Sequence, residues 1–504
     1  MQAPEQQSSS VSAVTAWLAA EPADDPAADL DALRAHVREL RGAVRSADEY
    51  LDCLTQLDWR ARDIAERFRA RLLNAPLPLG PELRQPVEGL VDALLDLAAG
   101  FQLGLEDVRG RWFGAPRAER GALTERALRL SGEAYLFACM IGAQPPTGFW
   151  LQVYALFGLA ELFGGGAEGE GAAALAAASR ILAVAALQPE SLTGRELVWV
   201  HDYLENAEAD GRVGRVRSAP ESSLYWMDPA RDEAPVAASR RGSGGAPGLF
   251  YFNSDALAQA VADRLEWLEL RIAQAEVLGL ERDVELLDSE HSGLPAGLTP
   301  VEVLSLLRRM HERWNAPPYR ESPRQHQEYT VQVCAGLRAI WELFQRGEQH
   351  ARIAEWMVYN ESPGGYAIIS VSGVSGVLSA GMVLALRPHA GKPWSLCIVR
   401  WIRSDDAEQV ELGLQVIAQG GEAATVGFRG GDVKTMTPAL VLPPLPGVRH
   451  GPAILVQTGS YTSRRFVLIS DGGRLYVAQG RVTSLDMQTA NIELLQYEID
   501  PYPL

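Results

Sequence analysis

The chain has 504 residues, which is too long for a single hydrophobic core and predicts roughly two to four domains. Its formal net charge is −18, which argues against a surface that binds nucleic acid or anionic lipid through bulk electrostatics. The four cysteines are far apart and form no CxxC pair, so we expect neither a metal centre nor a disulfide framework.

Residues 1–27 are rich in Ser, Gln, Ala, Pro and Asp, and this composition predicts a flexible lead-in. The start of the chain lacks the basic end and long apolar core of a secretory signal. Nor does any stretch approach the length of apolar sequence that a membrane span requires. We therefore expect a cytoplasmic protein without membrane insertion.

Apolar residues recur at helical spacing over residues 28–232, which predicts a helical domain. Two stretches show the pattern well, with Leu30, Leu33, Val37 and Leu40 on one face and Leu54, Leu57, Ile64, Phe68 and Leu72 on another. Residues 233–248 are small, polar and glycine-rich, as expected of a flexible loop. Residues 249–314 predict a further helical segment, in which Thr299 is a candidate N-cap and Pro300 the first helical residue.

After Trp314 the pattern changes to short β-branched runs punctuated by Gly and Pro, which predict strands of a small antiparallel barrel over residues 315–433. One short helix, at residues 337–348, interrupts these runs. A second set of strands follows over residues 434–504 and predicts a small C-terminal β-domain. The fold class is thus multidomain, helical first and all-β last.

The first informative motif is R-x-x-x-R, formed by Arg320 and Arg324 just before a predicted strand. Pro323 disfavours a helical conformation for the residue before it, so the two arginines are expected on a loop. A guanidinium is planar, permanently charged and able to donate two parallel hydrogen bonds, which suits phosphate oxygens and stacking on a purine.

The second motif, N-x-S-x-x-G, lies between two predicted strands and consists of Asn360, Ser362 and Gly365. The amide of Asn360 can donate and accept, the hydroxyl of Ser362 can rotate, and glycine permits a close backbone approach. These residues predict a polar notch at a strand edge. Taken alone, the motif is equally typical of a turn whose side chains bond their own backbone.

In this order and in an all-β context, the two motifs resemble those of the PilZ family of cyclic di-GMP receptors. Trp401 and Gly413, in two later strands, fit the same resemblance. The resemblance implies a six-stranded antiparallel barrel. It also implies that Arg320 and Arg324 clasp the phosphates, while Asn360, Ser362 and Gly365 contact the other side of the nucleotide.

The resemblance implies that the protein is a signalling receptor rather than an enzyme. It further implies cyclic di-GMP as the ligand and no metal or other cofactor. Nucleotide binding would act on a protein partner, as in control of motility, pilus function or biofilm formation, and the partner could belong to the pilus or flagellar machinery. This sequence departs from the pattern in the helix inserted between the motifs and in Glu321 and Glu361, which place negative charge beside an anion site.

Two alternatives remain open at this point. The barrel could have lost nucleotide binding and serve as a structural adaptor that docks proteins. An active site could also lie in the helical region, where His201 and Asp202 are adjacent. The simpler interpretation of that pair is a solvated helix face, and no set of nucleophile, base and orienting group can be named.

Overall fold

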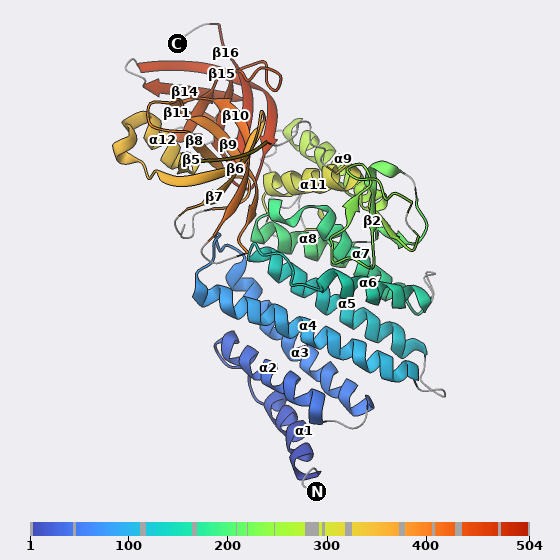
Figure 1. The fold of residues 1–504 in the computed structure, drawn as a ribbon. Helices are drawn as coiled ribbons and strands as arrows, with labels where there is room; N and C mark the ends of the chain where they lie inside the picture. The colour runs from blue at the N-terminus through green and yellow to red at the C-terminus, as the bar shows by residue number, and fades with distance from the viewer. Residues whose placement is uncertain are drawn as a thin grey trace.

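The structure is a computed structural model, and it describes most of the chain. The described residues are 4–43, 47–110, 117–163, 169–207, 209–218, 220–245, 247–277, 292–294, 298–317, 325–371, 378–405, 409–428, 436–471 and 475–501. Stacked helices form the N-terminal part, and two closed β-barrels form the C-terminal part (Figure 1). The predicted fold class is confirmed.

The helices lie side by side, from α1 at the N-terminal end to α9 and α11 beside the barrels (Figure 1). They are α1 (Pro4–Ala19), α2 (Pro26–Ala43), α3 (Ala47–Leu72), α4 (Pro81–Gly110), α5 (Arg117–Met140), α6 (Phe149–Leu162), α7 (Ala172–Ala186), α8 (Gly194–Asn206), α9 (Asp255–Val277) and α11 (Pro300–Asn315). One apolar core runs through the stack from Val14 to Trp314. Both predicted apolar faces, on α2 and α3, are buried in it.

Two of these helices begin with the same capping arrangement. In α8 the side chain of Thr193 accepts from the backbone of Glu196, whose carboxylate accepts in return from the backbone of Thr193. Thr299 and Glu302 do the same for α11, which confirms the predicted N-cap and the proline that follows it. Such a box satisfies two backbone donors that a helix start would otherwise leave unpaired.

The expected flexible lead-in, residues 1–27, needs correction because it contains helix α1. Val14 is buried, and the ring of Trp17 lies 5.0 Å from that of His36. Arg60 on α3 donates to the carbonyl of Ala20 at 2.9 Å. Apolar residues at positions 14, 17 and 18 carry the helical spacing, but the surrounding Ser, Gln and Pro obscured it.

A four-stranded sheet lies within the part of the chain that was expected to be helix and loop. Its strand order is β1-β4-β2-β3. The strands are β1 (Arg212–Gly214), β2 (Leu224–Met227), β3 (Val236–Ala237) and β4 (Phe250–Asn253). With two to four residues each, these strands are too short to show a reliable alternation in sequence. The predicted loop at 233–248 accordingly contains β3.

The first barrel closes in the strand order β10-β7-β6-β5-β8-β9, as the six-stranded antiparallel prediction required. Its strands are β5 (Gln325–Ala335), β6 (Ala354–Ser362), β7 (Gly365–Ser370), β8 (Val383–Arg387), β9 (Ser395–Arg403) and β10 (Glu411–Gln419). Helix α12 (Leu337–Arg346) lies between β5 and β6, where the sequence predicted a short helix.

The C-terminal β-domain is a second closed barrel, in the order β11-β12-β13-β16-β15-β14. Its strands are β11 (Glu422–Phe428), β12 (Thr437–Leu442), β13 (Ala453–Gln457), β14 (Arg465–Asp471), β15 (Leu475–Gln488) and β16 (Ile492–Ile499). Strand β11 precedes the predicted boundary at 433/434 yet pairs with β12 and β14. The sheets therefore change at Gly420 and Gly421, and the predicted boundary lay too late in the chain.

The two barrels share an apolar interface, which includes Leu396 and Ile417 from the first barrel and Leu440 and Leu455 from the second. Helix α12 packs into the same interface, and the indole nitrogen of Trp341 donates to the carbonyl of Ala424 at 2.7 Å. The inserted helix thus adds to the contact between the first and second barrels.

The first barrel is also fixed to the helical region by direct hydrogen bonds. The backbones of Leu77 and Leu378 exchange bonds of 3.0 and 3.1 Å, and Ser404 donates to Gly142 at 2.8 Å. The guanidinium of buried Arg84 donates to the hydroxyl of Ser404 at 3.2 Å and to the carbonyl of Asp405 at 3.0 Å. Among the helices that the structure describes, none has the length and apolarity needed to cross a bilayer.

Candidate functional site

The two arginines of the first motif, Arg320 and Arg324, lie outside the described residues. The description ends at Pro317, shortly after α11, and resumes at Gln325, the first residue of β5. In the sequence, residues 318–324, which we call the arginine segment, therefore join the end of α11 to the first strand of the barrel.

The start of β5 lies against the second motif. In the ladder between β5 and β6, Gln325 pairs with Glu361 and His326 with Asn360. Gln325, which immediately follows Arg324 in the sequence, therefore lies beside the strand that carries Asn360 and Ser362. Within the described residues, the start of β5 and the strand that carries the second motif are therefore neighbours, although the sequence separates them by an inserted helix.

Asn360 follows an irregularity in β6, because the register with β7 shifts between Val358 and Asn360. A bulge of this kind redirects the side chains next to it and is common beside functional sites. The side chain of Asn360 is half-buried, and it has no hydrogen-bond partner among the described residues. Its amide is thus available to a ligand.

Ser362 and Gly365 have structural roles in the β6–β7 hairpin. The hydroxyl of Ser362 donates to the carbonyl of Gly365 at 3.3 Å, as expected of a turn that satisfies its own backbone. A Cβ atom at Gly365 would lie 2.0 Å from the carbonyl oxygen of Leu414 on β10, so only glycine fits there. Packing alone therefore explains this glycine.

The carboxylate of Glu361, which the sequence placed beside the anion site, already has a partner. The hydroxyl of Tyr329 on β5 donates to Glu361 at 2.9 Å. Burial, together with this hydrogen bond, raises the pKa of Tyr329, so the tyrosine stays neutral and remains a donor. Sequence reasoning missed Tyr329, because its pairing with Glu361 depends on the strand register.

Trp401 and Gly413 face each other across β9 and β10. A Cβ atom at Gly413 would lie 1.9 Å from the indole nitrogen of Trp401, so the ring occupies the space that a side chain would need. The guanidinium of Arg403 lies 5.3 Å from the centre of that ring. The two residues singled out in the sequence therefore form one packing unit.

In the helical region, His201, Asp202 and Glu205 offer ligand atoms within 4.8 Å of one another. The guanidinium of Arg69 lies 3.9 Å from Asp202 and places a positive charge beside this cluster. The cavity next to His201 and Glu205 has a volume of about 40 Å³, which is room for a few water molecules. The expectation that the chain holds no metal stays a prediction.

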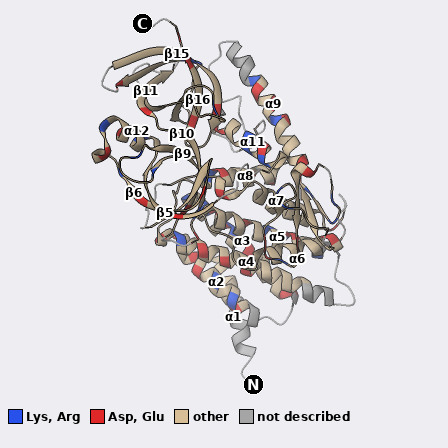
Figure 2. Ribbon diagram, turned by 45° about the horizontal axis from the view of Figure 1, so that its top comes forward, with Lys and Arg blue, Asp and Glu red and all other residues tan. Residues whose placement is uncertain are grey.

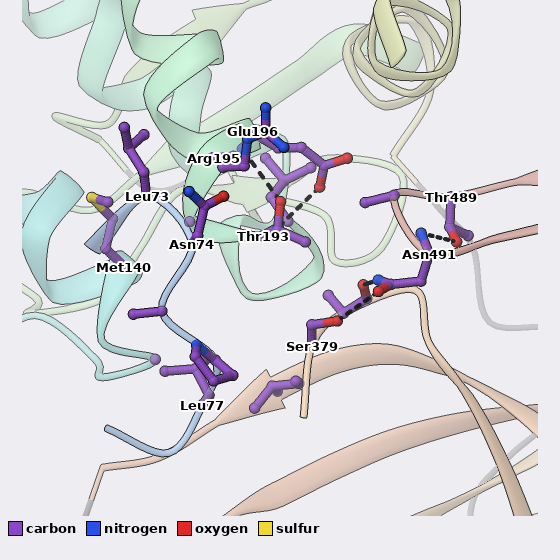
Figure 3. A pocket seen from close by; sticks show the side chains of 18 of the residues that line it. Leu73, Asn74, Leu77, Met140, Thr193, Arg195, Glu196, Ser379, Thr489 and Asn491 are labelled. Atoms are coloured by element: carbon purple, nitrogen blue, oxygen red, sulfur yellow. Dashed lines mark hydrogen bonds between the residues drawn. The ribbon is translucent and has the colours of Figure 1, made fainter. Parts of the chain in front are cut away.

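A larger cavity, of about 300 Å³, lies where the helical region meets both barrels (Figure 3). Its walls come from the loop after α3, the start of α8, the loop before β8 and the turn before β16. Asn491 of the second barrel bonds to the first, because its amide donates to the carbonyl of Ala380 at 2.8 Å and accepts from the hydroxyl of Ser379 at 3.1 Å.

Comparison with known proteins gives two family matches. The family described as the N-terminal domain of the cyclic-di-GMP receptor FimW matches residues 12–215. The family described as the middle PilZ domain of the same receptor matches residues 342–422. The second match includes Asn360, Ser362 and Gly365 but not Arg320 and Arg324. Together the matches span more than half of the chain.

A curated relative, the cyclic-di-GMP receptor FimW of Pseudomonas aeruginosa, is 36% identical over 61 residues. This alignment covers 12% of the chain and 10% of the relative, so it spans about a tenth of the relative's length. No solved structure matches the chain.

Proposed function

Because the chain belongs to the PilZ-domain family of cyclic di-GMP receptors, we propose that it binds cyclic di-GMP at the β6–β7 hairpin of the first barrel. Arg320 and Arg324 hold the phosphates and stack on guanine, while Asn360, Ser362 and Gly365 contact the other side of the nucleotide. The receptor acts in the cytoplasm and uses no metal or other cofactor.

The pairing of Gln325 with Glu361 is the observation that carries this proposal. It brings the residue after Arg324 to the strand that presents Asn360, so a single anionic nucleotide could reach both motifs. Two arginines held near each other repel, and a phosphodiester relieves that repulsion while accepting forked hydrogen bonds. The free amide of Asn360 can both donate to and accept from a guanine edge.

Calorimetric titration with cyclic di-GMP tests the proposal. Replacing both Arg320→Ala and Arg324→Ala should weaken binding at least about 100-fold, because each charged hydrogen bond contributes roughly 1.5–3 kcal/mol. Asn360→Ala should weaken it less and leave thermal stability unchanged. Arg338→Gln is the matched control, because this arginine is 83% exposed on α12 and belongs to neither motif.

Unaltered binding in the double arginine variant would reject this site. The absence of heat with the wild-type protein would instead favour the adaptor function. One observation supports that second candidate: Ser362 and Gly365 are both explained by the geometry of the hairpin, so part of the motif would persist without a ligand.

The proposed receptor transmits binding through α11. The arginine segment continues directly from this helix, which is anchored in the helical core by buried Trp314, whose indole nitrogen donates to the carbonyl of Ala183 at 3.0 Å. Ordering the segment on the barrel would therefore act on the helical region, which would present or withdraw a surface for a protein partner. We infer a partner of the pilus or flagellar machinery and an output in motility, pilus function or biofilm formation.

A further inference from the structure

A second cavity, of about 290 Å³, lies between α11, the short helix at Pro189–Ser191 and strands β9 and β15. Four arginines line it: Arg308, Arg309 and Arg313 from α11, and Arg400 from β9. Charges of both signs are spread over the helical region (Figure 2), whereas four arginines and only two carboxylates, Glu312 and Asp486, line this cavity in an acidic protein.

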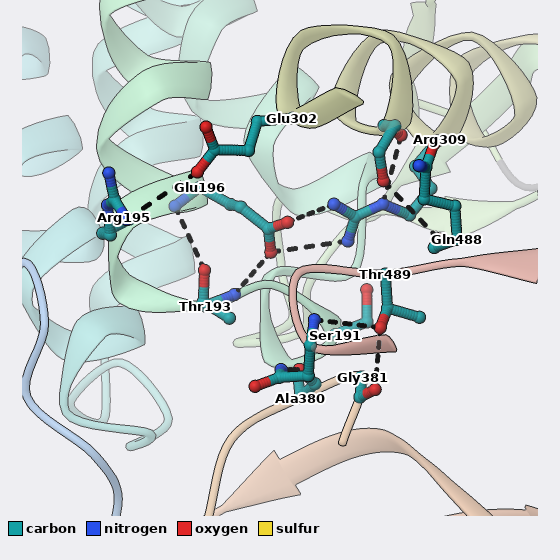
Figure 4. A network of polar contacts seen from close by, with 12 residues as sticks. Ser191, Thr193, Arg195, Glu196, Glu302, Arg309, Ala380, Gly381, Gln488 and Thr489 are labelled. Atoms are coloured by element: carbon teal, nitrogen blue, oxygen red, sulfur yellow. Dashed lines mark hydrogen bonds and ion pairs between the residues drawn. The ribbon is translucent and has the colours of Figure 1, made fainter. Parts of the chain in front are cut away.

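Two of these arginines already have carboxylate partners. Arg308 lies 2.7 Å from Glu269 on α9. Arg309 is paired with Glu196, the same carboxylate that caps the start of α8, as Figure 4 shows. The backbone carbonyl of Ser305 also accepts from Arg309 at 3.3 Å. These pairs form one wall of the cavity and fix α11 against α8 and α9.

The other two arginines lack such partners. Among the described residues, neither Arg313 nor Arg400 has a carboxylate within ion-pair distance, and Arg400 has no hydrogen-bond partner either. Arg313 donates only to the neutral side chain of Gln188. Arg400 points away from the barrel interior, since its neighbour Val399 belongs to the barrel core while Arg400 itself is exposed to the cavity.

On balance, the surroundings oppose the positive charge of both side chains, although Glu190 favours that of Arg313 and Glu312 that of Arg400. Burial, followed by the charge of Arg400, lowers the pKa of Arg313 to about 10. Desolvation inside the cavity, followed by the charge of Arg309, also lowers the pKa of Arg400 against the opposing charge of Glu312. Both groups remain charged at neutral pH, so an anion between them would relieve a real electrostatic cost.

The acidic residues of the cavity do not supply that anion within ion-pair distance. Asp486 accepts hydrogen bonds from Ser484 at 2.7 Å and from Gln496 at 2.8 Å, and Glu312 is exposed. The remaining wall mixes polar side chains with apolar ones, the latter including Met310, Leu485 and Met487. A compact anion with a small apolar part would complement this lining.

We propose that this cavity is an anion site that takes a phosphate group through Arg313 and Arg400. A phosphate monoester carries up to about two negative charges and a phosphodiester one, and both present oxygens that suit the paired donors of a guanidinium group. The volume lies at the lower limit of pockets that hold small molecules, so the ligand is a compact phosphate ester or one phosphate of a larger molecule. The cavity and its arginines do not depend on the proposed function; only cyclic di-GMP as the source of the phosphate rests on it.

The site lies near the β6–β7 hairpin without being part of it. Gln415 on β10 pairs with Gly365 on one side and with Ile398 on the other, so one strand separates the hairpin from the strand of Arg400. The phosphate could therefore belong to cyclic di-GMP itself or to a separate small molecule.

Titration of the full chain with pyrophosphate at low ionic strength tests the site. The wild-type protein should bind the probe and melt at a higher temperature in its presence. Arg400→Gln should weaken binding by roughly tenfold or more, in line with the loss of a charged hydrogen bond. Arg313→Gln should act similarly, and the exposed control Arg338→Gln should behave as wild type.

Folding and binding can be separated in this test. Because Arg400 has no partner and faces like charge, Arg400→Gln without pyrophosphate should melt at or above the wild-type temperature. Absence of pyrophosphate binding by the wild-type protein would overturn the proposal. Equal binding by wild type and Arg400→Gln would also overturn it, because the probe would then occupy another site such as the arginines at 320 and 324.

Cyclic di-GMP distinguishes the two sources of the phosphate. If the phosphate belongs to cyclic di-GMP, pyrophosphate should compete with cyclic di-GMP for binding. Arg400→Gln should then weaken the binding of cyclic di-GMP about as much as it weakens the binding of pyrophosphate. If the ligand is separate, cyclic di-GMP should bind equally well to the protein saturated with pyrophosphate. Failure of the proposed receptor function would appear as pyrophosphate binding without any binding of cyclic di-GMP.

Discussion

At the scale of single residues, the β6–β7 hairpin contains residues that stabilise its turn and one side chain that is free to bind a ligand. Ser362 and Gly365 serve the turn, whereas the amide of Asn360 has no partner among the described residues. The sequence motif could not separate these roles. Tyr329, which holds the carboxylate of Glu361, could not be predicted either, because only the strand register brings the two together.

Alanine substitutions of the adjacent glycines Gly364 and Gly365 should show how much of the effect on stability comes from steric packing and how much from the loss of glycine's backbone flexibility. Gly365→Ala should lower the free energy of unfolding by about 1–3 kcal/mol, because its Cβ atom would lie 2.0 Å from the carbonyl oxygen of Leu414. Gly364→Ala is the matched control: an added Cβ meets nothing within 4 Å, so a change of under about 0.5 kcal/mol is expected. Urea unfolding followed by circular dichroism measures both, and equal effects would contradict the packing argument.

At the scale of elements, the strands of the first barrel could be predicted well because their β-branched runs are bounded by Gly and Pro. Strand β11 was missed, since Glu422–Phe428 contains two alanines and a glycine, which are poor strand formers. The sequence showed helix α12, but nothing in it indicated that the helix packs against a second barrel. The pairing of α11 with β9 around the arginine cavity is equally invisible, because it joins segments far apart in the chain.

Trp341 tests the role of α12 between the barrels. Trp341→Phe keeps an aromatic ring but removes the hydrogen bond to Ala424, so the free energy of unfolding should fall by about 1 kcal/mol. Trp59→Phe is the control, because Trp59 is 66% exposed on α3 and its replacement should have little effect. Chemical unfolding of both variants gives the comparison. If the two substitutions are equally mild, α12 does not hold the barrels together through this bond.

At the scale of the whole molecule, the helical region and the two barrels meet around two cavities of similar size. The backbone bridge between Leu77 and Leu378 and the bonds from Arg84 attach the first barrel to the helices. Helix α11 is the element through which an event at the arginine segment would reach the helical core, because its last turn holds buried Trp314.

Hydrogen exchange should detect this coupling. We expect the amides in the last turns of α11 to exchange several-fold more slowly when cyclic di-GMP is bound, because the segment that follows the helix becomes fixed on the barrel. The variant with Arg320→Ala and Arg324→Ala should show no such protection. Heat of binding without a change in α11 exchange would mean that the nucleotide binds but does not act on the helical region.

The change of sheet at Gly420 and Gly421 bears on how the protein can be divided. A fragment that ends at residue 433 would retain β11 without β12 and β14, and an unpaired strand edge promotes aggregation. A fragment that ends at 420 would instead expose Leu396 and Ile417, which the second barrel covers. The smallest β-piece suited to separate study is therefore the pair of barrels.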